Sequence, residues 1–111
     1  MLDAEFHKRI EPLRRTYVAS LSDRAAAVAR ARAAIVTGGL TPSALTALWH
    51  DMHRMRGVAP TFGFAPLGDY AGRAEDLLER QIKEGPPMAG VAALVAALDE
   101  VLDELARVVG V

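Results

Sequence analysis

The sequence of 111 residues contains no cysteine, and aromatic residues make up only 5% of it. Without cysteine the chain can form neither a disulfide bond nor a thiolate metal site, which fits a protein of a reducing compartment. Because hydrophobic residues nevertheless make up 51% of the chain, the core must consist mainly of Leu, Val, Ala and Met. Ala and Leu are among the strongest helix formers, so this composition favours a helical protein.

Long apolar runs are also absent from the sequence. No run approaches the roughly 20 residues that a helix needs to cross a bilayer. Residues 1–10, MLDAEFHKRI, mix charged with apolar residues where a signal peptide would be uniformly apolar. We therefore expect a cytoplasmic protein with no membrane partner. Domains cluster around ~100–150 residues, so residues 1–111 are expected to form a single domain, and the start at Met1 favours a free-standing protein.

A concentrated basic patch is missing as well, and the net charge is −1. Residues 1–60 carry nine Lys or Arg against five Asp or Glu, whereas residues 61–111 carry four against nine. A protein that binds duplex nucleic acid usually needs a continuous basic stripe to displace counterions. The arginines of the first half are too dispersed for such a stripe, so we expect no nucleic-acid partner.

Apolar residues repeat with the period of an α-helix in every segment long enough to show one. A short opening helix is expected to end near Pro12, because proline disfavours a helix interior. A second helix follows and ends at Thr37-Gly38-Gly39. The inner face of the opening helix comprises Leu2, Phe6, Ile10 and Leu13, and that of the second helix comprises Leu13, Tyr17, Leu21, Ala25, Val28 and Ile35.

Three further helices are expected. The third begins at Thr41-Pro42, where the threonine hydroxyl can cap free N–H groups and proline suits the first turn. Gly63 ends it, Pro66 begins the fourth, and Gly85-Pro86-Pro87 separates the fourth from the last. The residues expected inside are Leu45, Leu48, Met52, Met55, Ala59 and Phe62 on the third helix; Leu67, Tyr70, Ala74, Leu77 or Leu78, and Ile82 on the fourth; and Val91, Leu94, Val95, Leu98, Val101, Leu102, Leu105 and Val108 on the last, with Asp99, Glu100, Asp103 and Glu104 partly outside.

These helices define the expected fold class. Four long helices joined by short loops pack most simply as an antiparallel up-and-down four-helix bundle. The short opening helix is expected to cap one end of this bundle. Because no segment alternates with a period of two, the protein is predicted to be all-α, without a sheet.

His53 stands out on the third helix. A helix turns by roughly 100° per residue, so His53 lies directly beside the inner residue Met52, on the border between core and solvent. Gly57, four residues later, costs ~1 kcal/mol relative to alanine inside a helix. One interpretation is that its missing side chain, which would lie against the imidazole, leaves the ring open to an approaching group. The other is that glycine eases a bend at Pro60.

The segment His53-Arg54-Met55-Arg56-Gly57, followed by Phe62-Gly63, resembles the signature of the histidine-containing phosphotransfer (HPt) domain family. In that pattern, a histidine is followed by any residue, a large apolar residue, Lys or Arg, and Gly, with a second glycine ten positions after the histidine. The number and order of the expected helices also resemble the four-helix bundle of the family. The resemblance covers the whole chain.

The resemblance implies a function and a set of partners. His53 would accept a phosphoryl group from an aspartyl phosphate on a response-regulator receiver domain and pass it to another receiver domain. Arg56 would hold the phosphoryl oxygens, and Gly57 would leave the ring accessible. A histidine kinase, hybrid or not, is the implied source of phosphate. The magnesium ion would belong to the receiver, so the chain would be a monomeric carrier without a cofactor of its own and not an enzyme.

The sequence departs from the family pattern at four positions. Met52, Met55 and Val58 replace a small residue, a leucine and a small or hydroxyl residue, and methionine is flexible enough to be tolerated in a core. Pro60 is expected to kink the helix one turn beyond Arg56 and so to affect how a receiver docks.

Alternatives remain open at this stage. His50 and His53 form an H-x-x-H pair that could bind a metal, although two imidazoles leave a zinc site short of ligands. Otherwise His50 is interpreted as a partly exposed neighbour that shapes the docking surface, Trp49 as a residue at the edge of the core or in a contact, and Arg54 and His7 as ordinary surface residues. The protein could instead be an HPt-like interaction module that binds a kinase or receiver without carrying phosphate, or an unrelated helical adaptor.

Overall fold

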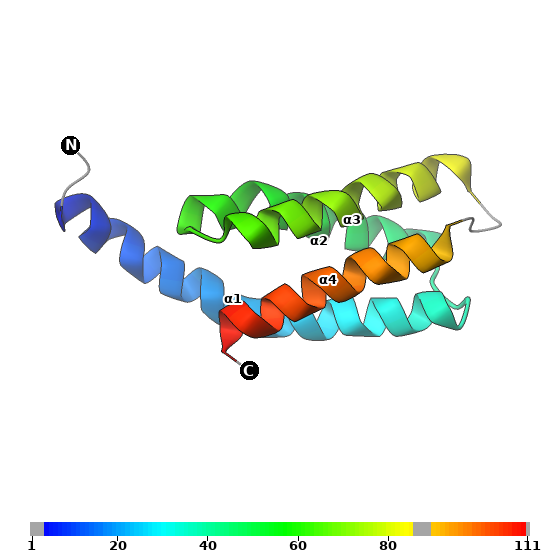
Figure 1. Ribbon diagram of the computed structural model, residues 1–111, viewed down its shortest axis with the longest axis horizontal. Coiled ribbons are helices and arrows are strands. Elements are labelled where there is room, and N and C mark those ends of the chain that lie inside the picture. The colour runs from blue at the N-terminus through cyan, green and yellow to red at the C-terminus, as the bar shows by residue number, and fades with distance from the viewer. Residues whose placement is uncertain (1–3, 86–89, 111) are drawn as a thin grey trace.

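The protein is described by a computed structural model that covers residues 4–85 and 90–110. Its four α-helices are α1 (Ala4–Val36), α2 (Pro42–Val58), α3 (Ala65–Glu84) and α4 (Val91–Val109), and a short 3-10 helix, η1 (Ala59–Phe62), follows α2. No residue in the covered ranges lies in a strand. Consecutive helices run in opposite directions, and α4 packs against both α3 and α1 (Figure 1). The predicted all-α, antiparallel four-helix bundle is confirmed.

The expected N-terminal capping helix is wrong. α1 is one continuous helix of 33 residues that passes through Pro12. Proline removes the N–H that would bond the Lys8 carbonyl, but this part of α1 is exposed, so water can satisfy that carbonyl. The N-terminal turns of α1 therefore extend beyond the end of the bundle instead of folding over it (Figure 1). Leu13 and Phe6, which were expected inside, are 59% and 41% exposed as a result, and Leu2 lies outside the described residues.

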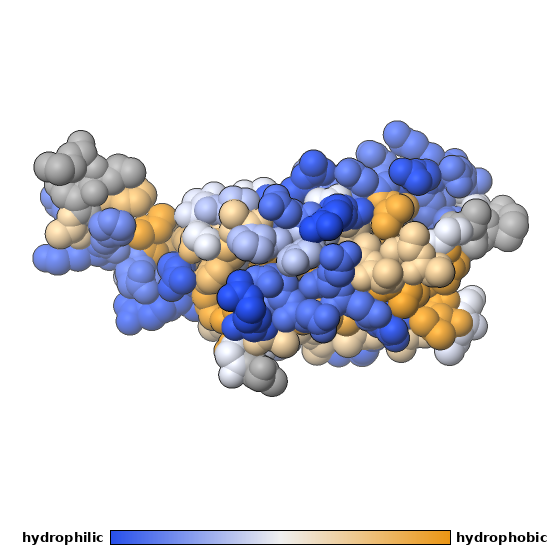
Figure 2. Space-filling model, in the orientation of Figure 1, coloured by the Kyte–Doolittle hydropathy of each residue, from blue (hydrophilic) through white to orange (hydrophobic). Residues whose placement is uncertain are grey.

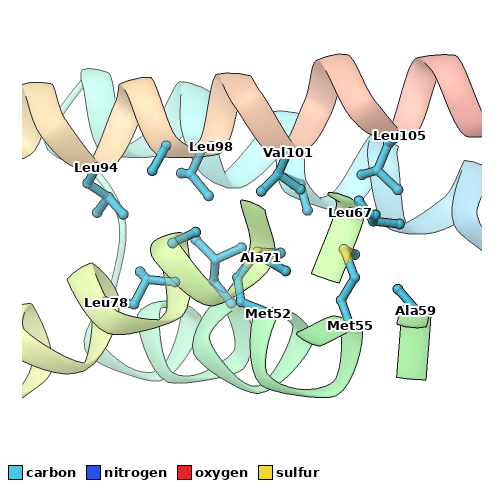
Figure 3. Packing of buried hydrophobic residues seen from close by; sticks show 14 of the residues in the cluster. Met52, Met55, Ala59, Leu67, Ala71, Leu78, Leu94, Leu98, Val101 and Leu105 are labelled. Atoms are coloured by element: carbon cyan, nitrogen blue, oxygen red, sulfur yellow. The ribbon is translucent and has the colours of Figure 1, made fainter. Parts of the chain in front are cut away.

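The interior of the bundle is formed by one face of each helix. On α2 and η1, four of the six residues of the expected stripe are buried, namely Leu48, Met52, Met55 and Ala59, whereas Leu45 and Phe62 are only partly buried. Figure 3 shows Met52 and Met55 pointing toward side chains of α3 and α4. Their buried partners there include Leu67, Ala71, Leu78, Leu94, Leu98, Val101 and Leu105. Full burial of one such leucine or methionine contributes about 1.5–3 kcal/mol of transfer free energy.

Two further assignments to the inside or outside of the bundle, one on α3 and one on α4, are wrong. Ile82 was expected inside but is 39% exposed, whereas its neighbour Gln81 is buried and donates a hydrogen bond to the Gly85 carbonyl. Glu104 was expected partly outside but is buried, where it pairs with Arg107. In both cases a polar side chain is tolerated inside because it has a hydrogen-bond partner. On the face shown in Figure 2, hydrophilic residues predominate and hydrophobic ones appear in patches.

Local signals set the ends of the helices that carry the site. The Thr41 hydroxyl accepts a hydrogen bond from the Ala44 N–H, and Pro42 lies in the first turn of α2. α2 ends at Val58, and Pro60 lies in the first turn of η1, where a missing N–H breaks no helical bond. The expected kink at Pro60 is thus a change from α-helix to 3-10 helix. Gly63 ends η1 with a φ of 90°, which favours glycine.

The remaining breaks lie near the other end of the bundle. Gly85 follows α3 with a φ of 72°, whereas Pro86 and Pro87 lie outside the described residues.

None of the helices in the covered ranges combines the length and the hydropathy that crossing a membrane requires.

Candidate functional site

His53 lies on α2 at the border between core and solvent, as the sequence predicted. Met52, directly before it, is completely buried, whereas the His53 side chain is 62% exposed. The backbone of α2 is held by the packing of Met52 and Met55 in the core, so the exposed ring rests on a rigid helix. The imidazole is therefore accessible to a group approaching from solvent.

Glu75 of α3 binds the inner edge of this ring. The distance from His53 Nδ1 to Glu75 Oε2 is 2.7 Å, and the Glu75 side chain is only 10% exposed. When the Glu75 carboxyl is ionised it can only accept hydrogen bonds, and the Nδ1 atom of His53 then carries the proton. In the neutral ring this leaves the lone pair on Nε2. The arrangement thus produces a nucleophilic nitrogen at Nε2, with Nδ1 held by the protein.

Arg56 shares the same carboxylate. Its Nη1 atom lies 3.3 Å from Glu75 Oε1 and 3.3 Å from Asp76 Oδ1. The hydrogen bond to Glu75, with the charges of Asp76 and Glu75, raises the pKa of Arg56 above its ordinary value, so the guanidinium stays charged. Glu75 therefore holds His53 with one oxygen and Arg56 with the other. This places a fixed cation one helical turn from the imidazole.

Two glycines of α3 allow α2 and η1 to approach closely. A Cβ atom at Gly72 would lie 3.0 Å from Arg56 Nε, and a Cβ at Gly68 would lie 2.8 Å from Pro60 Cγ. The Arg56 side chain thus crosses α3 over Gly72 to reach the two carboxylates. The ring of Pro60 occupies the space that a side chain at position 68 would need.

One of the two interpretations of Gly57 was that a side chain there would lie against the imidazole of His53, and this interpretation is wrong. A Cβ atom at this position would meet nothing within 4 Å, so it would not lie against the imidazole of His53. α2 ends one residue later, at Val58. Gly57 itself is exposed, one helical turn after His53.

Trp49 contacts the flat face of His53. The two rings are nearly parallel, with an angle of 10° between their planes and 5.1 Å between their centroids. Trp49 is partly buried and packs against the core, which confirms its predicted place at the core edge. His50 is exposed and meets the indole edge to face at 4.9 Å. His7 is exposed as predicted, and Arg54, also exposed, lines a groove between α1 and α2.

Sequence reasoning brought together His53 and Arg56 but missed Glu75, Gly72 and Gly68. Glu75 lies 22 residues from His53, on another helix, so no local motif includes it. One signal was available, because Glu75 falls between Ala71 and Leu78 on the apolar face of its own helix. A carboxylate in such a position needs a partner. Within residues 4–85 and 90–110, no three His, Cys, Asp or Glu side chains form a group that could hold a metal ion.

Comparison with known proteins gives one finding. A family model described as the Hpt domain matches residues 12–108. The comparisons with curated proteins and with solved structures give no match. The matched segment includes His53 and Glu75, and it omits the first turns of α1, which extend beyond the bundle.

Proposed function

Because the chain belongs to the Hpt domain family, whose members are phosphotransfer modules of two-component systems, we propose that it carries a phosphoryl group on His53 within a phosphorelay. In this proposal, His53 accepts the group from the aspartyl phosphate of one receiver domain and passes it to the aspartate of another. A hybrid histidine kinase would supply the phosphate at the start of the relay. The chain is expected to act in the cytoplasm as a monomer.

The observation that carries this proposal is the orientation of His53 by Glu75. The bond at Nδ1 directs the free lone pair to Nε2, on a ring that is 62% exposed. In the transfer step, Nε2 attacks phosphorus, a nitrogen–phosphorus bond forms, and the bond from phosphorus to the aspartyl oxygen breaks. The bonding electrons leave with the aspartate as a carboxylate. The Nδ1 proton stays on the ring, where the Glu75 carboxylate stabilises the positive charge that develops.

Arg56 supports the same step. Phosphoryl transfer proceeds through a loose transition state with charge spread over three oxygens, so a nearby cation that needs no rearrangement lowers the barrier. Both hydrogen bonds from Arg56 to carboxylates of the described residues use Nη1. A guanidinium carries five N–H groups in all, so others are available for phosphoryl oxygens. The magnesium ion and the acidic cluster of the reaction are expected on the receiver, which makes this chain a carrier and not an enzyme.

The proposal is tested by label transfer from a phosphorylated receiver domain. The wild-type chain should take up label that is acid-labile and base-stable, as expected for phosphohistidine. His53→Gln should abolish the uptake, while His50→Gln, a matched change one turn away on the same helix, should retain it. Transfer of label to the His53 variant would refute the assignment. Binding of the receiver without any transfer to the wild type would instead favour the interaction module.

A further inference from the structure

We propose that Trp49 is a positioning residue for the transfer reaction, in that its indole holds the plane of the His53 ring. The inference rests on the proposed function and adds a second constraint on the same imidazole. Glu75 binds the ring at one atom, with 2.7 Å between Oε2 and Nδ1. Trp49 covers one of the two flat faces of the ring, with 10° between the planes.

One hydrogen bond does not fix the orientation of the His53 ring. A histidine side chain turns about two bonds, and with a single bond at Nδ1 the ring can still swing about that contact, which moves Nε2 away from the line of attack. A parallel aromatic face opposes this motion, because tilting the imidazole separates the two rings or makes them clash. The two contacts together define both the direction and the plane of the ring. Nε2 is then presented in one orientation.

Trp49 is itself held in place. It lies one helical turn before His53 on α2, the spacing at which two side chains of a helix meet. Its indole packs against the buried cluster of the bundle and meets the His50 ring edge to face. The indole Nε1 atom is buried and has no hydrogen-bond partner among the described residues. A leucine at this core edge would avoid the unmade hydrogen bond, so a role for a flat aromatic surface explains why the position is not simply aliphatic.

This geometry predicts a specific loss of rate. Trp49→Leu keeps an apolar side chain at the core edge but removes the flat surface, and we expect transfer from a saturating phosphorylated receiver to become about 10-fold slower, because small misplacements of reacting atoms have effects of this order or larger. The concentration of receiver that gives half of the maximal rate should change less than 2-fold, since binding of the receiver is not the step affected. Trp49→Phe retains an aromatic face and should recover most of the rate.

The experiment combines single-turnover transfer with nitrogen NMR of the His53 ring, on the full chain. In the wild type the proton should reside on Nδ1, and phosphorus NMR should place the phosphoryl group on Nε2. In Trp49→Leu the ring is free to swing away from Glu75, so the neutral ring should show a mixture of the two tautomers. Leu45→Ala is the matched control, because Leu45 packs partly buried against the same core one turn before Trp49 but lies two turns from His53.

The outcomes distinguish a positioning role of Trp49 from general loosening of the bundle and from failure of the proposed function. A folded Trp49→Leu variant with the wild-type rate and the wild-type tautomer would overturn the proposal. An equal loss of rate in Leu45→Ala would also overturn it, because the loss would then follow from general loosening of the bundle. If the wild type accepts no phosphoryl group, the proposed function fails instead, and the tautomer measurement still decides whether Trp49 positions the ring.

Discussion

The Arg56 side chain lies so close to Gly72 that a single added carbon atom on α3 would contact it, at 3.0 Å from Nε and 3.2 Å from Cδ. This contact joins a residue that the sequence marked as functional to one that it did not. The same face of α3 carries Glu75, whose two oxygens bind His53 and Arg56. The site thus depends on how α3 is placed against α2.

Gly72→Ala should slow phosphoryl transfer without lowering the free energy of unfolding. Alanine favours a helix over glycine by up to ~1 kcal/mol, and the neighbour in the way is a flexible arginine that can move, so the free energy of unfolding should stay the same or rise. The shift of Arg56 should lengthen its 3.3 Å hydrogen bonds to Glu75 and Asp76, and phosphoryl transfer should slow by several-fold. Urea unfolding and single-turnover kinetics measure the two effects. In Arg56→Ala, the further change Gly72→Ala should have no effect on the rate; a further loss would show that Gly72 does not act through Arg56.

Gly68→Ala, in contrast, should lower the free energy of unfolding. The added Cβ would lie 2.8 Å from Pro60 Cγ and 3.4 Å from the Arg56 carbonyl oxygen, where a proline ring and backbone cannot easily move. We expect a loss of about 1–3 kcal/mol in the free energy of unfolding, the usual range for overpacking. Adding Pro60→Ala should restore part of this loss. If the double variant is as unstable as the sum of the two single variants, Pro60 is not the obstructing group.

Glu75 should contribute both as an acceptor and as a charge. Glu75→Gln keeps an oxygen that can accept the Nδ1–H bond of His53 but removes the negative charge, so transfer should slow moderately. Glu75→Ala removes both and should slow transfer by about 10-fold or more, because the His53 ring loses its orientation and the charge that stabilises its positive form. Asp76→Ala, a matched change on the adjacent residue, should be milder because, among the described residues, the Asp76 carboxylate pairs with Arg56 and not with His53. Equal rates in Glu75→Ala and the wild type would contradict the proposed role.

Gly57→Ala should fold without difficulty, because its Cβ would meet nothing within 4 Å. The free energy of unfolding should therefore rise by up to ~1 kcal/mol. The residue is expected to matter only when a receiver docks beside His53, so binding of the receiver should weaken while the unbound chain is unchanged. Titration of the receiver onto the variant checks this. Unaltered binding and transfer would leave Gly57 without a functional role.

Acid should destabilise the bundle partly through Glu104. The hydrogen bond from Arg107 lowers the pKa of the Glu104 carboxyl below its ordinary value. Because the carboxyl binds protons more weakly in the folded chain than in the unfolded chain, its contribution to stability is fully present above the unfolded pKa and is lost as the pH falls through the lowered folded pKa. Unfolding by urea at pH 7 and near pH 3 should show that Glu104→Gln is less stable than the wild type at pH 7 and that the difference shrinks in acid. A difference that does not change with pH would contradict the prediction.

The sequence by itself determined the helices, the inner stripe of α2 and the position of His53 on its border. These features depend on spacing along one helix and on turn residues such as Thr41 and Gly63, which act over a few neighbouring positions. Pro12 shows the limit of this reasoning. It was interpreted as a helix boundary, yet α1 continues through it because the exposed carbonyl that loses its partner can bond to water.

Only the tertiary structure decided what surrounds the imidazole. Glu75 meets His53, and Gly72 makes room for Arg56, because α2 and α3 pack at a particular rotation and separation. Those two quantities are set by the combined fit of many side chains in the core, and no local pattern encodes them. The sequence could therefore place the reactive ring on the surface, but the identity of the group that orients it depended on how the two helices pack.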